Sequence, residues 1–186
     1  MPTDGPPPKP TNPPRIPIML AAVSVVLITT ARLLGPWNIL DNDQLRPHSY
    51  VQDIIRNDNW LVQHDWTGEV ASKPPLYAWI ASIPALITNH VGPLELAIPS
   101  MIGVLIASIT IAMWVSRKIG ARTACTAVLA FVCTPLMIKQ VTLARTDALY
   151  AGLTTLAAVL AFRAWTTRKG WWEFWLVAGL ATLTKG

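Results

Sequence analysis

Long apolar runs separated by short polar segments make up most of the chain. Four full runs cover residues 18–34, 98–115, 121–138 and 148–165, and a further run begins at Trp171. A helix that crosses a bilayer needs about 20 predominantly apolar residues, and each full run approaches that length. Residues 76–88 form another apolar run, which is too short for an ordinary span. The pattern predicts an all-α polytopic membrane protein with about five transmembrane helices, the last of them cut short.

The first apolar run follows Arg15 and a tail, residues 1–17, that contains eight prolines. A cleaved signal peptide and a retained span both fit an apolar run near the amino terminus. We favour the retained span, because the run is about as long as a bilayer core requires, no convincing small-residue cleavage site follows it, and the tail is long for a signal. The tail has no apolar periodicity and is predicted to be disordered.

The basic residues decide the predicted topology. Those of the tail, of residues 117–122 and of residues 163–169 fall on one side of the membrane only if residues 76–88 lie in the interface. The positive-inside rule makes that side cytoplasmic, so the amino terminus is expected in the cytoplasm. Residues 18–186 then form one transmembrane domain, and residues 35–97 form a long periplasmic loop.

The long loop is predicted to hold two interfacial helices. Residues 44–56 place four apolar side chains on one helical face, which is typical of an amphipathic helix lying on the membrane. These side chains are Tyr50, Val51, Ile54 and Ile55. The polar residues 57–59 end this helix, and Gly68 marks a turn. Pro74 and Pro75 suit the first turn of the second helix, which covers residues 76–88.

Composition supports a membrane protein and excludes other classes. The 186 residues are 52% hydrophobic and 13% charged, whereas soluble domains are about 25% charged. The net charge of +5 comes from basic residues scattered between apolar runs, so no nucleic-acid partner is expected. Cys125 and Cys133 lie in one apolar run and have neither disulfide nor metal-site spacing. We therefore expect no metal site and no cofactor.

Asp43 and Lys73 are the first candidates for chemistry. Asp43 follows the first span, where a carboxylate can take a proton from an attacking hydroxyl. The alternative for Asp43 is an ordinary solvated loop acid. Lys73 precedes two prolines at the start of an interfacial helix, where a rigidly held ammonium suits a lipid phosphate. The alternative for Lys73 is an interfacial lysine that only extends its ammonium into water.

Three further charged residues lie on the same predicted side of the membrane. Arg145 and Asp147 join two spans on the outer face, against the positive-inside tendency, so Arg145 either binds phosphate or pairs with Asp147. Lys185 follows the last apolar run. Charged residues at a membrane edge are candidates for function by default. The topology brings these residues to one face, but it does not by itself bring them together in space.

Several motifs resemble, in their order, the amino-terminal half of the bacterial GT-C fold membrane glycosyltransferases. This family is related to the aminoarabinose transferases of lipid A and to the protein O-mannosyltransferases. The similarity covers about residues 35–186, and the Lys73 motif and the final Thr-Lys-Gly are its most specific parts. The motifs are Asp43-Gln44, Asn59-Trp60-Leu61-Val62, Lys73-Pro74-Pro75-Leu76-Tyr77-Ala78-Trp79, Pro99-Ser100, Arg145-Thr146-Asp147 and Thr184-Lys185-Gly186.

The resemblance implies a glycosyltransferase of the bacterial inner membrane with a periplasmic site. Such an enzyme moves a sugar, without a metal, from a polyprenyl-phosphate donor to a lipid, glycan or protein acceptor. Relatives usually carry Glu where this chain has Gln44, many carry Arg where it has Ala97, and they continue for several hundred residues, so the chain is expected to be their amino-terminal part. The implied site residues are Asp43 as general base or acceptor-positioning group, Lys73, Arg145 and Lys185 at the donor phosphate, and Asp147, Gln44 and Tyr77 as further candidates.

Two other functional classes compete with the enzyme. A truncated, non-catalytic relative would bind lipid phosphate or a partner helix with the same basic residues. A transporter is less well supported, because the sequence has no inverted repeat and no pair of spans broken by Gly or Pro. The sequence does not identify the sugar or the acceptor.

The predicted topology can be tested with reporter fusions. A reporter fused after Gly68 is expected to be periplasmic, and one fused after Ile119 is expected to be cytoplasmic, because the basic clusters orient the spans. Alkaline phosphatase activity and green fluorescent protein fluorescence measure the two sides. A cytoplasmic signal at Gly68 would contradict the assignment of the whole loop to the outer side.

Overall fold

The computed structural model describes residues 14–35 and 42–185, and within these ranges it is almost entirely helical. One isolated antiparallel bridge, between His64 and Val70, accompanies the helices there. The all-α prediction is therefore confirmed for the described residues. The helices are α1 (Arg15–Leu33), α2 (Asn42–Asn57), α3 (Leu76–Thr88), α4 (Pro93–Lys118), α5 (Ala121–Val132), α6 (Pro135–Gln140), α7 (Thr146–Thr167) and α8 (Trp171–Thr182).

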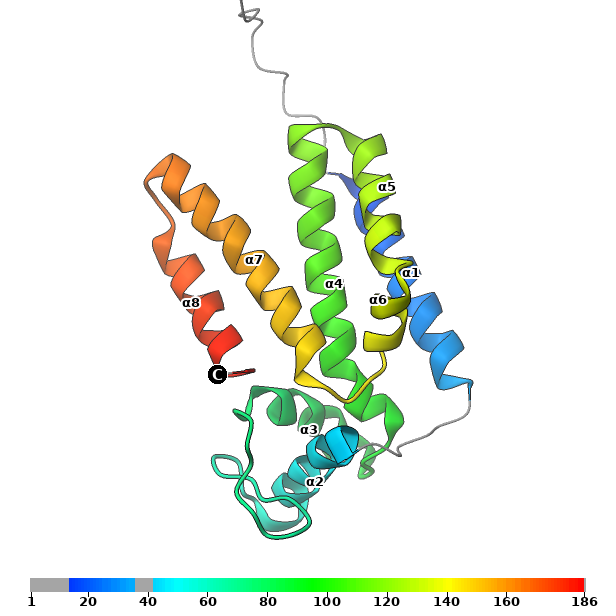
Figure 1. Cartoon of the computed structure of the whole chain (residues 1–186), viewed down its shortest axis with the longest axis vertical. Helices are drawn as coiled ribbons and strands as arrows, with labels where there is room; N and C mark the ends of the chain where they lie inside the picture. Colours follow the sequence, from blue (N-terminus) through cyan, green and yellow to red (C-terminus); the bar gives the residue numbers. More distant parts are fainter. Residues whose placement is uncertain (1–13, 36–41, 186) are drawn as a thin grey trace, which may run out of the picture.

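Helix α4 forms the centre of a helical bundle (Figure 1). It packs against α1, α5 and α7, and α8 packs against the outer side of α7. Helices α2 and α3 lie together at one end of the bundle, beneath the first residues of α4 and α7. Among the described helices, α4 and α7 are long and apolar enough to cross a membrane, while α1 and α5 have shorter apolar segments. The bundle therefore carries a separate helical layer, made by α2, α3 and the loop between them, at one end.

Two glycines allow α4 and α7 to approach closely. A side chain at Gly103 would overlap the backbone of Ala148 and Leu149, and one at Gly152 would overlap the backbone of Gly103 itself. Small residues are enriched where transmembrane helices meet, because attraction there depends on close van der Waals contact. This crossing fixes the start of α7 against α4, and thereby the position of Arg145 and Asp147.

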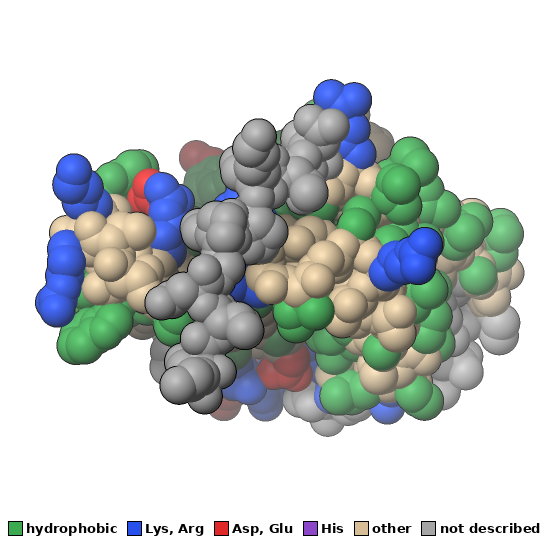
Figure 2. Space-filling model, turned by 90° about the horizontal axis from the view of Figure 1, so that it is seen from above, with side chains coloured by type: hydrophobic (Ala, Val, Ile, Leu, Met, Phe, Trp, Pro, Cys, Tyr) green, Lys and Arg blue, Asp and Glu red, His purple; other side chains and the backbone are tan. Residues whose placement is uncertain are grey.

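The opposite end of the bundle carries the basic clusters (Figure 2). Arg117 and Lys118 lie in the last turn of α4, and Arg168 follows α7. Lys118 lies 5.5 Å above the Trp114 ring, and the guanidinium of Arg168 lies 5.2 Å from the Trp165 ring. Cations stacked on tryptophans suit the headgroup level of a membrane, where the aromatic belt lies. The two ends of the bundle thus differ in charge and in structure, as the predicted topology requires.

The apolar face of α2 packs inside the protein. Tyr50, Val51 and Ile54 are buried in one cluster with α3 residues and Leu96. The sequence predicted the helix and its apolar face, but it placed that face on the membrane. The structure corrects this point, because α3 and the first turn of α4 pack against the apolar face and separate it from lipid.

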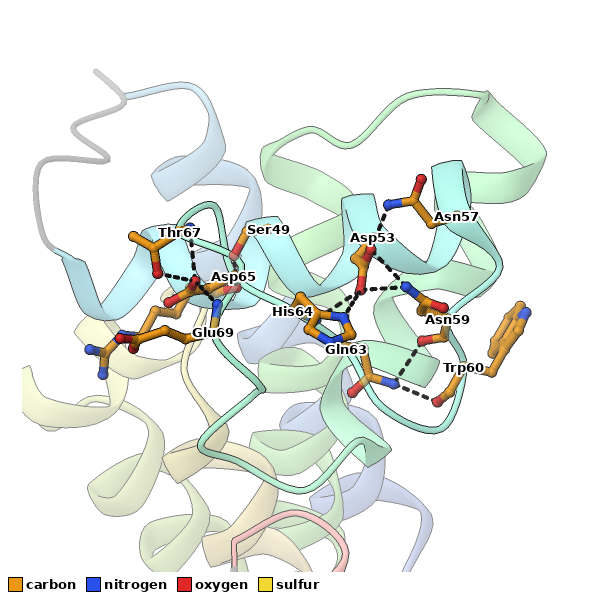
Figure 3. Close-up of polar contacts among 11 residues, drawn as sticks. Ser49, Asp53, Asn57, Asn59, Trp60, Gln63, His64, Asp65, Thr67 and Glu69 are labelled. Carbon is orange, nitrogen blue, oxygen red and sulfur yellow. Dashed lines mark hydrogen bonds and ion pairs between the residues drawn. The ribbon is translucent and has the colours of Figure 1, made fainter.

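A buried carboxylate holds the loop after α2 (Figure 3). Asp53 accepts hydrogen bonds from Asn57 Nδ2 at 2.6 Å, from Asn59 Nδ2 at 3.1 Å and from the His64 backbone N–H at 2.8 Å. Burial by itself would raise the pKa of Asp53, but the hydrogen bonds from Asn57, His64 and Asn59 together hold that pKa below its usual range. Asp53 therefore ties residues 57–64 back to α2.

Several helix boundaries differ from the predicted runs. The run predicted at 121–138 divides into α5 and α6, because Pro135 begins a new helix whose first turn is capped by the Thr134 hydroxyl. Helix α4 begins at Pro93 and not at Ile98, since Pro93 suits the first helical turn and Glu95 accepts a hydrogen bond from the Gly92 N–H. Helix α1 begins at Arg15, so residues 15–17, assigned to the tail, form its first turn. The rest of the predicted disordered tail lies outside the described residues.

The glycine crossing gives a stability prediction. Gly103→Ala should lower the free energy of unfolding by about 1–3 kcal/mol, because the atoms it meets are backbone and can give way only if the helices separate. Thermal unfolding in detergent measures the effect. Gly179→Ala is the matched control, since a side chain there meets nothing within 4 Å, and it should leave stability unchanged or higher. Equal stability of the two variants would contradict the close crossing.

The Asp53 network predicts a pH-dependent contribution to stability. Asp53→Asn should cost about 1–3 kcal/mol at neutral pH, because one amide oxygen cannot replace two carboxylate oxygens that accept these bonds. A lowered pKa stabilises the fold above the usual Asp value, about 3.9, and the contribution disappears as pH falls through the folded-state pKa. The difference between parent and variant should therefore shrink in acid, measured as hydrogen-exchange protection of the His64 amide.

Asp58→Asn is the matched control for this measurement. The Asp58 carboxylate is exposed and accepts one bond, from Trp60 Nε1 at 2.7 Å. Its φ of 57° also suits Asn. A loss at Asp58 as large as that at Asp53, or a loss at Asp53 independent of pH, would contradict the assignment.

Candidate functional site

A cavity of about 210 Å³ lies where the α2–α3 layer meets the bundle. We call it the first cavity. Four separate segments contribute to it: α2, the residues that lead into α3, the start of α7 and the residues after α8. Its lining residues are Arg46, Pro47, Tyr50, Ser72, Lys73, Pro74, Tyr77, Ala78, Arg145, Thr146, Asp147 and Lys185. The structure therefore brings together five residues that the sequence singled out, namely Lys73, Tyr77, Arg145, Asp147 and Lys185.

The segment with Lys73 is fixed on both sides. Before it, the backbone N–H of Ser72 donates to the Tyr50 hydroxyl at 3.3 Å. After it, Pro74 and Pro75 restrict the chain, and the Leu76 N–H donates to the Leu183 carbonyl at 3.1 Å. That last bond joins the start of α3 to the end of α8, so Lys73 and Lys185 border the same cavity. The Lys73 side chain is exposed and lines the cavity.

Tyr77 connects three elements beneath the cavity. Its buried hydroxyl donates to the Leu96 carbonyl at 2.6 Å and lies 3.3 Å from the Ser100 hydroxyl. Ser100 in turn donates to the Leu143 carbonyl at 2.5 Å and lies 3.3 Å from the Arg145 carbonyl. Burial raises the pKa of the Tyr77 phenol well above its usual range, so the group stays neutral and can donate. This network fixes the backbone on which Arg145 is carried.

Asp147 and Lys185 form an ion pair at the edge of the cavity. Lys185 Nζ lies 2.8 Å from Asp147 Oδ1, and both side chains are 43% exposed. The hydrogen bond and the charge of Asp147 raise the pKa of Lys185, so its ammonium stays charged. The sequence analysis offered Arg145 as a partner of Asp147, and the structure shows Lys185 in direct contact with that carboxylate. Arg145 is half-buried at the N-cap of α7.

The cavity has a strong positive charge. Among its described lining residues, Arg46, Lys73, Arg145 and Lys185 are cationic, and Asp147 is the only acid. Charges at the edge of a low-dielectric bundle are less screened than charges in bulk water. Arginine and lysine are also the side chains that bind phosphate best. The geometry and charge therefore suit a phosphate group at a membrane surface.

Arg46 and Ser72 are lining residues that sequence reasoning missed. Arg46 lies within the predicted helix at residues 44–56, but the shared helical spacing of Arg46 and Asp43 follows only from the observed start of α2 at Asn42. Asp43 and Gln44 are in α2, but their side chains lie outside the described residues. Ala97, the position at which the resemblance implied an arginine, is fully buried in α4.

Comparison with solved structures identifies the fold. ArnT from Cupriavidus metallidurans, bound to undecaprenyl phosphate, superposes with a TM-score of 0.75 and 19% identity over 91% of this chain and 32% of that chain. The apo state of the same protein gives a TM-score of 0.73 and 19% identity over the same shares. The chain therefore spans about a third of the length of these structures. The polytopic membrane architecture predicted from the apolar runs is confirmed at the level of the fold.

Comparison with protein families identifies the lineage. No curated protein is significantly similar over the chain. The family model described as dolichyl-phosphate-mannose-protein mannosyltransferase matches residues 72–186. The match begins one residue before Lys73 and includes Arg145, Asp147 and Lys185, so it covers most of the first cavity. The motifs, the fold and this match agree with the resemblance seen in the sequence, and the chain belongs to the dolichyl-phosphate-mannose-protein mannosyltransferase family.

Proposed function

We propose that the chain forms the donor-phosphate site of a membrane glycosyltransferase that uses a polyprenyl-phosphate sugar. One observation carries the proposal: Lys73, Arg145 and Lys185 come from three separate segments and line one cavity at a membrane end. The structural relative that was crystallised with undecaprenyl phosphate supports the same class of donor. We place the site at the periplasmic face of a bacterial inner membrane, because the basic clusters lie at the opposite end of the bundle.

Each cation has a role in the proposed transfer. The bond between the anomeric carbon and the phosphate oxygen breaks, and the polyprenyl phosphate leaves with the bonding electrons. Lys73 holds the phosphate and offsets the negative charge that develops on the leaving oxygen. Arg145 adds the planar, two-point contact that guanidinium groups make with phosphate. Lys185 supplies a third cation, which Asp147 holds in place at 2.8 Å.

Asp43 is the proposed base for the acceptor hydroxyl. The acceptor oxygen attacks the anomeric carbon, and its proton passes to the Asp43 carboxylate as the glycosidic bond forms. Helical spacing supports this role, because Arg46 lines the cavity and Asp43 precedes it by three residues in α2. Tyr77 is proposed as a positioning residue, since its hydroxyl is committed to the Leu96 carbonyl. The acceptor is a lipid, glycan or protein hydroxyl.

Substitution of Lys73 tests the donor site. Lys73→Ala should weaken polyprenyl-phosphate binding by about 10- to 150-fold, because a charge-assisted contact is worth about 1.5–3 kcal/mol. Lys73→Arg should recover only part of this, since the longer, planar group is misplaced beside Pro74 and Pro75. The measurement is titration of a short-chain polyprenyl phosphate onto the purified full protein in detergent. Lys139→Ala is the matched control, because Lys139 is exposed in α6 and does not line the cavity.

Two results decide between the enzyme and its alternative. Equal affinities of the parent and both Lys73 variants would remove Lys73 from the site. If Lys73 holds the donor, Asp43→Asn should abolish sugar transfer and leave donor binding largely intact, because the amide keeps the shape of the carboxylate but is not a base. Donor binding without transfer in the parent protein would support the non-catalytic, lipid-phosphate-binding alternative.

A further inference from the structure

A second cavity of about 560 Å³ lies on the other flank of α2. It is lined by His48, Gln52, Ile55 and Arg56 of α2 and by residues 89–91, which connect α3 to α4. The first cavity uses a different set of α2 residues, Arg46, Pro47 and Tyr50. At 100° per residue, the two sets face different sides of the helix. The function proposed above leaves the second cavity without a role.

The chemistry of the second cavity suits an anion. Arg56 carries a permanent charge, and His48, His90 and the amides of Gln52 and Asn89 offer further donors. None of the described lining residues is acidic. Glu95, the buried acid in the first turn of α4, accepts from the Gly92 N–H at 3.0 Å and from the Thr88 hydroxyl at 3.1 Å. These bonds hold the carboxylate against the first turn of α4, and Glu95 does not line the second cavity.

The cationic groups near His48 disfavour its protonation. Burial lowers the pKa of His48, and the charges of Arg56 and His90 lower it further, while a hydrogen bond with the backbone of Val91 acts in the opposite direction. Gln52 Nε2 lies 3.5 Å from His48 Nε2 and fixes the ring from the same helix. An anion placed between these groups would relieve the repulsion among them.

The α3 helix, which leads into this basic cavity, has an exposed apolar face. Ile83, Leu86 and Ile87 follow helical spacing along α3 and are 58%, 50% and 82% exposed. The helix ends at Thr88, and Asn89 and His90 of the cavity lining come next. An apolar face next to an anion-binding cavity at the end of a membrane bundle matches the two parts of a lipid, its acyl chains and its charged headgroup.

We propose that the second cavity binds the phosphate headgroup of a membrane lipid, with Arg56, His48 and His90 around the phosphate and the acyl chains along Ile83, Leu86 and Ile87. This site is separate from the first cavity, so it does not require that the donor binds as proposed above. A phosphate monoester lipid fits best, because the available donors come from both α2 and the α3–α4 connection and can surround several phosphate oxygens.

The three histidines of the sequence provide a site-specific measurement. The full protein is labelled at its histidine rings, the signals are assigned by His→Gln substitutions, and short-chain phosphatidic acid is titrated in detergent. The signals of His48 and His90 should shift with one saturation curve. The signal of His64 should stay in place, because that ring is held 3.1 Å from the Asp53 carboxylate outside the cavity. Absence of a shift at His48 and His90 would overturn the proposal.

Two variants and two further probes sharpen the result. Arg56→Gln should weaken phosphatidic acid binding at these rings at least about tenfold, whereas Arg122→Gln, an equally exposed arginine in α5, should not change it. Lys73→Ala should also leave the His48 response intact, so failure of the donor site and failure of this site remain distinguishable. Inorganic phosphate or a diacylglycerol of the same chain length should bind far more weakly. An equal response to either probe, or an unchanged affinity in Arg56→Gln, would contradict a lipid-phosphate site.

Discussion

The pair of hydroxyls contributed by Tyr77 and Ser100 holds the site together. Tyr77 reaches from α3 to the Leu96 carbonyl in α4, and Ser100 reaches from α4 to the backbone at Leu143 and Arg145. Both hydroxyls are buried, and a buried polar group without a partner is costly, so the arrangement is strongly favoured over looser ones. The α2–α3 layer, the central helix and the start of α7 therefore have fixed relative positions.

The charge of the first cavity follows from that arrangement. Four cations surround it with one acid among the described lining residues, and like charges at this density repel one another. The folded protein tolerates the repulsion because the side chains stay partly in water and because Lys185 pairs with Asp147. An anion bound in the first cavity, as proposed above, would reduce this repulsion. The same reasoning applies on a smaller scale to Arg56 and its neighbouring histidines on the other flank of α2.

Packing between small residues sets the rest of the geometry. Gly103 and Gly152 bring α4 and α7 into backbone contact, which places the first turn of α7 beside the residues that lead into α3. The Leu76–Leu183 backbone bond then brings the end of α8 to the same place. Two helix crossings and a few backbone hydrogen bonds thus bring motifs that are far apart in the sequence together at the first cavity.

The sequence by itself determined the helical class, the order of the apolar helices, and the identity of five cavity residues. Apolar runs of membrane length, and isolated cations beside them, can be recognised from neighbouring residues alone, because they do not depend on contacts between distant segments. Tertiary structure alone decided which charges share a cavity, that Arg46 joins them, and that α2 turns its apolar face to α3. It also divided one predicted span at Pro135. These outcomes depend on contacts between distant segments. Periodicity along one segment predicts that it has an apolar face, but it does not predict which surface packs against that face.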